Sequence, residues 1–163
     1  MMKTPDTKTS EPTLFDQANR EWDAGKAKQA FKLFLLAAKQ GETNALNSIG
    51  YFFDKGIGVP KNTNKALVWY KKAARAGDTL AYANIGIVYR NRRNLERARF
   101  WFLKAIKSGD GEAALELAKV YLKRQSPSDF VRAKQYLHMA LNSQSICESA
   151  IDEAKALLKN IND

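Results

Sequence analysis

The sequence predicts an all-α fold, a solenoid of about four antiparallel helix pairs closed by a C-terminal capping helix. Three observations predict it: a frame of alanines around a large residue recurs four times, a second helical frame precedes three of the copies, and a glycine follows three of them. The copies are 36, 32 and 35 residues apart. Self-similarity at such a period is typical of stacked supersecondary repeats.

The first frame is an alanine, a large residue four positions later, and an alanine three positions after that. Spacings of three and four place residues on one face of a helix. The closing glycines Gly41, Gly77 and Gly109 stand where a left-handed C-terminal cap is favoured. The four copies are Ala30-Phe34-Ala37, Ala66-Tyr70-Ala73, Ala98-Phe102-Ala105 and Ala133-Leu137-Ala140.

The second frame places a small residue on the helix that precedes each later copy. Gly50, Gly86 and Ala118 hold this position, and small side chains there let the two helices of a pair approach closely. The expected pairs are 12–23 with 26–40, 43–54 with 63–76, 79–91 with 94–108, and 111–123 with 129–143.

The ends of the chain are expected to differ from the repeats. Residues 1–10 are polar and predict a flexible tail. The solenoid is expected over residues 11–145, and residues 146–163 form the capping helix. Apolar residues at steps of three or four, such as Ile146, Ala150 and Ala154, support that helix.

Residues 45–77 resemble the Sel-like repeat family, a branch of the tetratricopeptide repeats. The resemblance rests on the loop Gly56-Ile57-Gly58-Val59-Pro60 and on the helix after it, where Lys65-Ala66, Trp69-Tyr70 and Lys72-Ala73-Ala74 keep the family order. Residues 78–110 are more similar to a plain tetratricopeptide unit. The resemblance implies a right-handed superhelix, clear at the centre of the chain and looser at its ends.

The glycine loop itself poses a choice between a phosphate cradle and a connector. Nucleotide-binding glycine loops follow a strand, or carry lysine and a hydroxyl residue after the last glycine. Here the loop follows an expected helix, and Gly58 is followed by Val59-Pro60. A connector between two helices is the better interpretation.

Composition indicates where such a protein works. The N-terminal stretch has no apolar run typical of a signal peptide, no segment is long enough to span a bilayer, and the single cysteine cannot form an internal disulfide. We therefore expect a cytoplasmic protein without membrane partners. The formal net charge is +10, of which +9 lies between residues 54 and 111; this could attract an acidic partner or only form a solvated helix face.

The histidine, cysteine and carboxylate residues show no spacing typical of a catalytic site. His138 is the only histidine and has no metal-ligand spacing around it, and Cys147 has no histidine near it in sequence. Carboxylate pairs lie on helix faces beside lysines. We expect a protein that is not an enzyme and that has no cofactor or metal.

Function is therefore expected on the surface. In the resembled fold the first helix of each pair lines a concave groove, and an aromatic, amide and charged lining suits a protein or peptide. A dense basic patch at an inter-helix turn, formed by Arg90, Arg92 and Arg93, is a candidate for an acidic partner. The groove residues carried over by spacing are Phe15, Asn19, Trp22, Asn47, Tyr51, Asp54, Ile87, Arg90 and Lys119.

Three functional hypotheses follow. The first is a non-catalytic protein-interaction module that binds through the concave groove. The second is an immunity- or inhibitor-type protein that neutralises one acidic partner. The third, which the sequence favours least, is a nucleic-acid-binding module that uses the basic central region, because no groove with interleaved basic and aromatic residues is apparent.

Overall fold

The computed structural model describes residues 11–124 and 126–162, and within these ranges the chain is helical, without strands. The predicted tail, residues 1–10, lies outside the described residues. The helices are α1 (Leu14–Asp23), α2 (Ala27–Lys39), α3 (Ala45–Lys55), α4 (Thr63–Arg75), α5 (Leu80–Asn91), α6 (Leu95–Lys107), α7 (Gly111–Leu122), α8 (Pro127–Leu141) and α9 (Glu148–Asn162).

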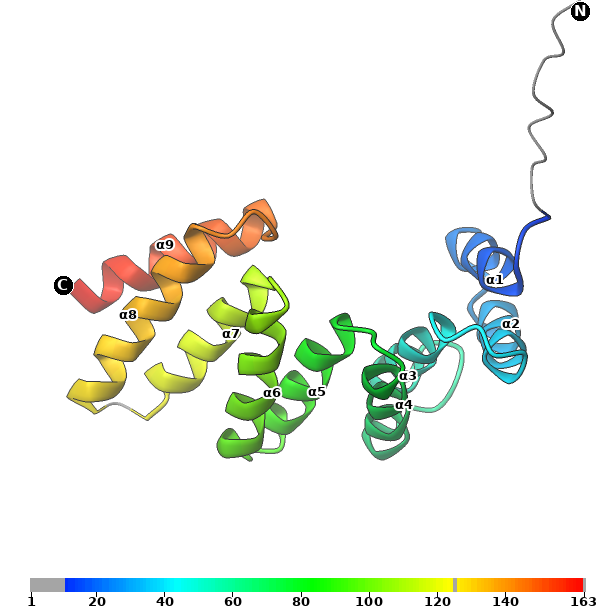
Figure 1. Cartoon of the computed structure of the whole chain (residues 1–163), viewed down its shortest axis with the longest axis horizontal. Helices are drawn as coiled ribbons and strands as arrows, with labels where there is room; N and C mark the ends of the chain where they lie inside the picture. The colour runs from blue at the N-terminus through cyan, green and yellow to red at the C-terminus, as the bar shows by residue number, and fades with distance from the viewer. Residues whose placement is uncertain (1–10, 125, 163) are drawn as a thin grey trace, which may run out of the picture.

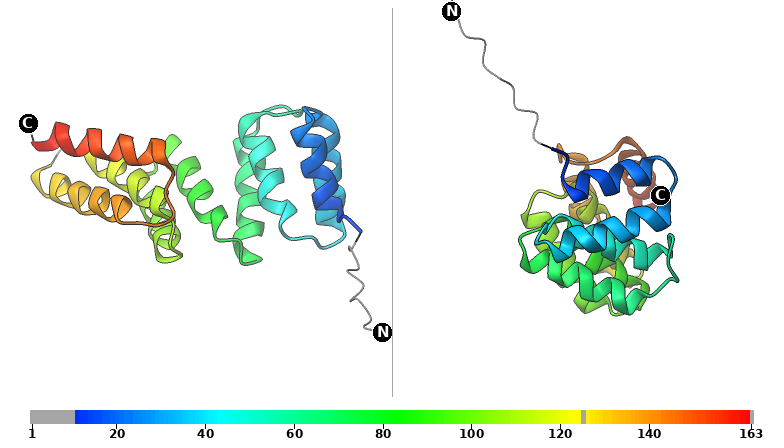
Figure 2. Two further views of the ribbon diagram at one scale, coloured as in Figure 1. Left: turned by 90° about the horizontal axis from the view of Figure 1, so that it is seen from above. Right: turned by 90° about the vertical axis from the view of Figure 1, so that its right-hand side faces the viewer.

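The helices are stacked as antiparallel pairs along one axis. Each first helix (α1, α3, α5, α7) packs most extensively against the second helix that follows it (α2, α4, α6, α8), and each second helix also contacts the next first helix. The pairs follow one another from α1 and α2 at one end to α8 and α9 at the other (Figure 1), and views from above and from the end show the same order (Figure 2). The predicted all-α solenoid of helix pairs is confirmed.

Small residues set the distance within a pair. A Cβ atom built on Gly50 would lie 2.5 Å from the ring of Tyr70, and one on Gly86 would lie 2.6 Å from the ring of Phe102. Both rings are almost fully buried. A side chain at either glycine would therefore force the two helices of the pair apart.

Side-chain caps mark the start of three of the four second helices, α4, α6 and α8. The Lys65 amide donates to Asn62 Oδ1 at 2.9 Å, and the Arg97 amide donates to Asn94 Oδ1 at 3.2 Å. Ser126 serves α8 in the same way, directly before Pro127. Such caps satisfy backbone donors that have no partner inside the helix.

The glycine loop joins α3 to α4 within the second pair and lies against the first pair. A Cβ atom at Gly58 would lie 2.9 Å from the backbone of Ala27, at the start of α2. Gly58 also has a φ of +66°, a conformation that glycine adopts without steric cost. The loop therefore rests on the preceding pair, which fits a connector between two helices.

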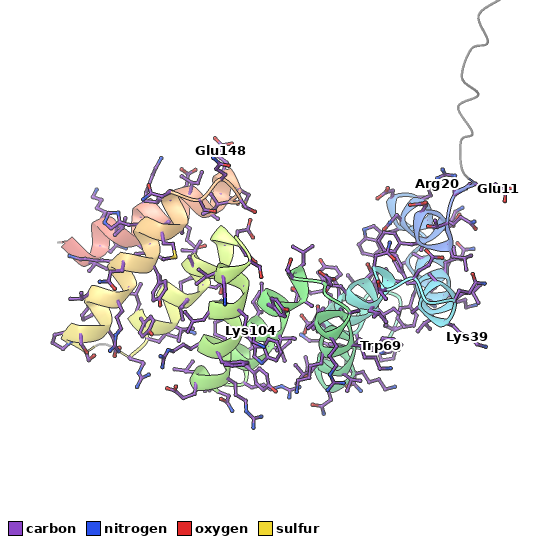
Figure 3. All side chains as sticks on the ribbon, viewed as in Figure 1. Glu11, Arg20, Lys39, Trp69, Lys104 and Glu148 are labelled. Carbon is purple, nitrogen blue, oxygen red and sulfur yellow. The ribbon has the colours of Figure 1, made fainter. Side chains whose placement is uncertain are left out.

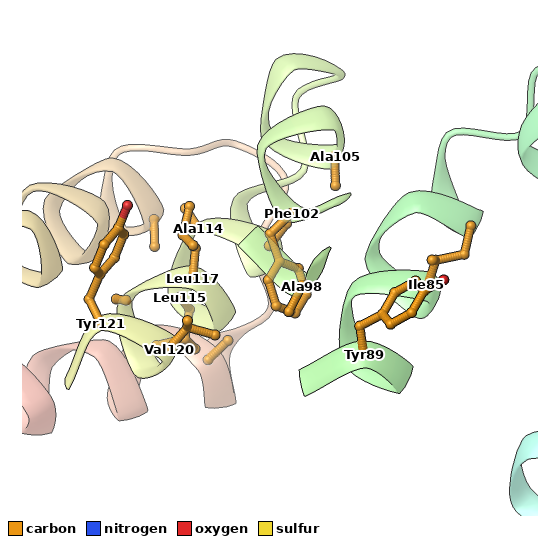
Figure 4. Close-up of a cluster of buried hydrophobic side chains, with 14 of the residues drawn as sticks. Ile85, Tyr89, Ala98, Phe102, Ala105, Ala114, Leu115, Leu117, Val120 and Tyr121 are labelled. Atoms are coloured by element: carbon orange, nitrogen blue, oxygen red, sulfur yellow. The ribbon is translucent and has the colours of Figure 1, made fainter. Parts of the chain in front are cut away.

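The buried core falls into two clusters. The first lies among α1, α2 and α3 and is rich in aromatic rings, including Phe31, Phe34 and Phe52. The second extends from α4 to α9 and is built on alanines around larger residues. In it, Phe102 of α6 lies between Ile85 of α5 and Leu117 of α7 (Figure 4).

Helix α9 packs against α8 and touches α7, with Ala150 and Ala154 buried. These two alanines repeat the spacing of Ala113 and Leu117 in α7. Ala154 is followed by the exposed Lys155, whereas the corresponding Leu117 of α7 is followed by the small Ala118.

Candidate partner-binding groove

The candidate site lies on the surface formed by α1, α3, α5 and α7, here called the first-helix face. On each of these helices, residues at steps of three and four share a side, so corresponding positions of successive pairs form rows across this face. In Figure 3, Arg20 of the first helix α1 lies above Lys39 of the second helix α2, at the N-terminal end of the molecule. The two sets of helices thus present different surfaces.

The first-helix face contains a cavity of about 340 Å³ at its N-terminal half, here called the amide pocket. Three consecutive first helices supply its wall, and the buried rings of Phe34 and Phe52 form its floor. Four of the predicted groove residues meet there. The wall consists of Asn19 and Trp22 of α1, Asn47, Ser48 and Tyr51 of α3, and Asn84 of α5.

A hydrogen bond between amides links two pairs across the pocket. Asn84 Nδ2 donates to Asn47 Oδ1 at 3.0 Å, although the two residues are 37 positions apart. Each side-chain amide has two donor hydrogens and an acceptor oxygen, so both retain hydrogen-bonding capacity for a ligand. The lining of the pocket is uncharged. It therefore suits neutral polar groups, such as the backbone of a peptide.

Aromatic rings supply the apolar part of the pocket. The Trp22 ring lies 4.8 Å from that of Phe52, centroid to centroid, and is half-buried. Tyr51 is 40% exposed, with the Lys55 ammonium 5.7 Å from the centre of its ring. Half-exposed tryptophan and tyrosine side chains are the types that most often anchor protein partners.

The C-terminal half of the first-helix face is ionic. Arg90 of α5 forms an ion pair with Glu116 of α7, Lys119 Nζ lies 2.7 Å from Glu116 Oε1, and the same ammonium donates to Glu153 of α9 at 3.0 Å. Burial lowers the pKa of the Arg90 guanidinium, and the charge of Glu153 opposes that shift. The predicted groove residues Arg90 and Lys119 are thus already matched by carboxylates of the chain itself.

The remaining predicted groove residues lie outside the amide pocket. The Phe15 ring packs 5.6 Å from that of Phe34, within the first pair. Ile87 is half-buried against the second core cluster. Asp54 is half-buried near the end of α3, with one oxygen 4.0 Å from Lys55 Nζ.

The structure separates the three arginines of the predicted basic patch. Arg90 points to Glu116 on the first-helix face, while Arg92 donates to Asn64 Oδ1 at 2.8 Å and to Thr63 Oγ1 at 3.3 Å, at the start of α4. Arg93 lies in the turn to α6, beside a cavity of about 560 Å³ that is also lined by Arg124 and Glu96. Of the three arginines of the predicted patch, Arg92 and Arg93 line this cavity and Arg90 does not.

Sequence reasoning missed three side chains of this face, Ser48, Asn84 and Glu116, and also Glu153 of α9, which pairs with Lys119. Asn84 lies three residues before the predicted Ile87, and Glu116 three before the predicted Lys119, so helical spacing could have found both. Glu153 gave no such signal, because its contact depends on how α9 crosses α7.

Other kinds of site find little support in the described part of the chain. Among residues 11–124 and 126–162, no group of three histidine, cysteine or acidic side chains could hold a metal ion. His138 and Cys147 are both exposed, and the Cys147 sulfur lies 3.2 Å from the Ser149 hydroxyl. No described helix has the length and apolar composition that a membrane span needs.

Comparison with protein families gives matches along most of the chain. The model of the Sel1 repeat matches residues 24–42, 43–78, 80–110 and 111–145. Each matched segment from residue 43 onward contains one helix pair. The spacing that predicted the pairs thus coincides with the repeat of this family.

Two curated relatives share short stretches with the chain. A putative Sel1-like repeat-containing protein of Acanthamoeba polyphaga mimivirus is 34% identical over 59 residues, which are 36% of this chain and 11% of the relative. A chitin synthase regulator of Malassezia restricta is 39% identical over 49 residues, 30% of this chain and 3% of the relative. The matches therefore span a small part of these much longer proteins.

Solved structures match over more of the chain. A Sel1 repeat protein from Oxalobacter formigenes superposes with a TM-score of 0.64 at 28% identity, covering 77% of this chain and 54% of the other. A protective antigen of uropathogenic Escherichia coli with a Sel1-like repeat fold gives 0.66 at 27%, covering 80% and 30%. The MamA protein gives 0.62 at 20% identity, covering 91% and 87%, which shows the fold alone.

Proposed function

Because the chain belongs to the Sel1 repeat family, whose proteins generally mediate protein–protein interactions, we propose that it binds a segment of a partner protein along its first-helix face. The observation that supports this proposal is the amide pocket, in which three consecutive first helices contribute amide, hydroxyl and aromatic groups to one recess. A single pair could not form it.

The chemistry of the pocket fits an extended, uncharged stretch of a partner. The amides of Asn47 and Asn84 can pair with backbone N–H and C=O groups, and Trp22 and Tyr51 can pack against an apolar side chain. The ionic half of the face adds few free charges, because the charges of Arg90 and Lys119 are paired. Its role would be to set orientation at the rim rather than to supply most of the affinity.

Site-specific photo-crosslinking tests this proposal. A benzophenone amino acid in place of Tyr51 should yield adducts with partner proteins in the source cells, whereas the same group in place of the exposed Val131 on α8 should not yield them. Adding Trp22→Ala and Asn84→Ala should remove the adducts while the helical circular dichroism is kept. Identical adducts at both positions, or adducts that survive the two substitutions, would contradict a binding site in the amide pocket.

The same experiment separates two of the roles that the sequence leaves open. One dominant adduct would favour an inhibitor-type protein with a dedicated partner, and several different adducts would favour an adaptor. Mass spectrometry of the adducts gives both the number of partners and the partner segment that reaches Tyr51.

A further inference from the structure

A second recess opens on the opposite surface, formed by α2, α4, α6 and α8 and here called the second-helix face. It is a cavity of about 320 Å³ between the neighbouring helices α4 and α6, here called the basic cavity. Its lining combines three cations with two aromatic rings. The residues are Lys71, Ala74 and Arg75 of α4, Tyr82 of α5, and Trp101 and Lys104 of α6.

The cations of the basic cavity have no carboxylate partner. Among the described residues, no Asp or Glu oxygen lies within 4.0 Å of the charged nitrogens of Lys71, Arg75 or Lys104. This contrasts with Arg90 and Lys119 on the first-helix face, which are paired. Three unneutralised cations around one recess favour an anionic ligand group there.

Aromatic rings hold one of the cations in place. Lys104 Nζ lies 5.0 Å from the ring centre of Trp101, 5.9 Å from that of Tyr82 and 4.8 Å from that of Phe100. The rings of Tyr82 and Trp101 are 5.9 Å apart, centroid to centroid. Cation–π contacts of this kind fix an ammonium without neutralising its charge. The cavity is therefore organised before any ligand arrives.

Apolar side chains stand exposed beside the cavity. Phe100 is 53% exposed, next to Trp101 and one helical turn before Lys104, and Val68 is 55% exposed, one turn before Lys71 and Lys72. Exposed apolar residues next to unpaired cations offer a contact for an apolar side chain beside an acidic one. A purely ionic ligand would leave these apolar groups without a partner.

The same features argue against nucleic acid and a membrane. Single-stranded nucleic acid is held by bases stacked on free aromatic faces, but Lys104 already lies over the rings of Tyr82 and Trp101. A flat membrane would meet exposed side chains rather than a recess between two helices. An acidic protein segment can place a carboxylate into the cavity and lay an apolar neighbour along its rim.

We propose that the basic cavity is a second docking site, which takes an acidic segment of a partner protein, with a carboxylate against Arg75 and Lys104 and an apolar side chain against Phe100 and Val68. The site is independent of the amide pocket, since the two lie on different faces and share no residue. The chain would then join two partner segments, one on each face.

The chain offers a matched control one pair away. Corresponding positions between α2 and α4 hold Leu35, Lys39, Trp69 and Lys72, with Lys72 Nζ 4.2 Å from the ring centre of Trp69. Leu35 stands there in place of Lys71, so these positions hold two cations where the basic cavity has three. The variant Arg75→Gln/Lys104→Gln and the control Lys39→Gln/Lys72→Gln each remove two charges from the same face.

The test is a selection of random peptides displayed on phage, followed by anisotropy titration of the selected peptides with purified protein. We expect enrichment of sequences with Asp or Glu next to an apolar residue. The Arg75→Gln/Lys104→Gln variant should bind them at least about ten-fold more weakly, and the control variant within about two-fold of the unchanged protein. Tyr51→Ala/Asn84→Ala should leave this binding unchanged, which separates it from the proposed function of the amide pocket.

Several outcomes would overturn the proposal. Selected peptides without an excess of Asp and Glu would do so. Equal losses of peptide affinity in the two charge variants would also do so, because they would indicate attraction by net charge alone. Vesicles containing phosphatidylserine and a labelled oligothymidine serve as further probes. If either bound through Arg75 and Lys104 while no acidic peptide was selected, the cavity would belong to a lipid or a nucleic-acid site. Circular dichroism of each variant confirms that the helices are retained.

Discussion

The second helices of the four pairs carry thirteen basic and two acidic side chains, whereas the first helices carry four basic and six acidic ones. The two sets therefore differ in formal charge by thirteen units, from +11 to −2, although they alternate along one chain and share one core. Their exposed apolar residues differ as well: among the described residues, eight of the ten large exposed apolar side chains lie on second helices.

This contrast is not needed for folding. The alanine frames occur in every repeat, with glycine or alanine at the close contact within the pair, whatever the charge on its surface. Exposed charge pairs contribute little to stability. A set of unpaired cations even costs free energy through mutual repulsion. The contrast is better explained by two surfaces that meet different partners.

The largest expected effect is on the close packing within a helix pair, on which both faces depend. Gly86→Leu should force Phe102 out of its place and lower the free energy of unfolding by about 1–3 kcal/mol. Thermal unfolding followed by circular dichroism measures it. The double variant Gly86→Ala/Phe102→Leu reproduces Ala118 and Leu137 of the fourth pair, and it should be more stable than Gly86→Leu. An unchanged melting midpoint for Gly86→Leu would argue against the close contact within the pair.

The next effect concerns the ion pairs of the first-helix face. Glu116→Gln leaves Arg90 and Lys119 without their shared carboxylate, and we expect a loss of about 1–2 kcal/mol. Glu96→Gln is the control, since Glu96 also meets two arginines but is largely exposed, and it should cost less than about 0.5 kcal/mol. Urea unfolding measures both losses of stability. Equal losses would show that burial does not strengthen the ion pairs of Glu116 with Arg90 and Lys119.

A smaller effect of the opposite sign is expected at the turn between the two faces. Arg93 has a φ of +58°, whereas the corresponding turn of the first pair has Gly25 at +74°. A residue with a Cβ atom is strained in this conformation, so Arg93→Gly should raise the free energy of unfolding by about 0.5–1 kcal/mol. A decrease, measured in the same urea titration, would mean that the arginine side chain makes a stabilising contact that outweighs its backbone strain.

The smallest effect appears only in alkaline solution. Burial, with the nearby charge of Asp54, raises the pKa of Tyr70, which lies between the two helices of its pair. The folded state thus favours the neutral phenol, so this contribution to stability is complete below the ordinary tyrosine pKa of about 10 and declines as the pH rises above it. Tyr70→Phe should therefore reduce the alkaline decline of the melting temperature, measured by circular dichroism as a function of pH, and an unchanged decline would contradict this contribution.

The sequence by itself determined the pairs and their order. Alanine frames at steps of three and four, glycines after the helices and capping residues such as Asn62 act within one or two turns, and their effect can be predicted without knowing the neighbours. The same is true of the glycine loop, where Val59-Pro60 after the last glycine favours a connector over a phosphate cradle. Helical spacing likewise placed Asn19 with Trp22 on one side of α1 and Asn47 with Tyr51 on one side of α3, and all four line the amide pocket.

Only the tertiary structure decided which side chains of different pairs meet. The Asn47–Asn84 bond, the Lys119–Glu153 pair and the closure of Lys71 and Trp101 around one cavity depend on the rotation and offset between neighbouring pairs. Those quantities follow from the fit of many buried side chains at once, because close-packed interiors admit few arrangements. A local spacing rule contains no such information. Arg90 therefore lies apart from Arg92 and Arg93 although it is close to them in sequence, while residues 30 to 37 positions apart build the sites.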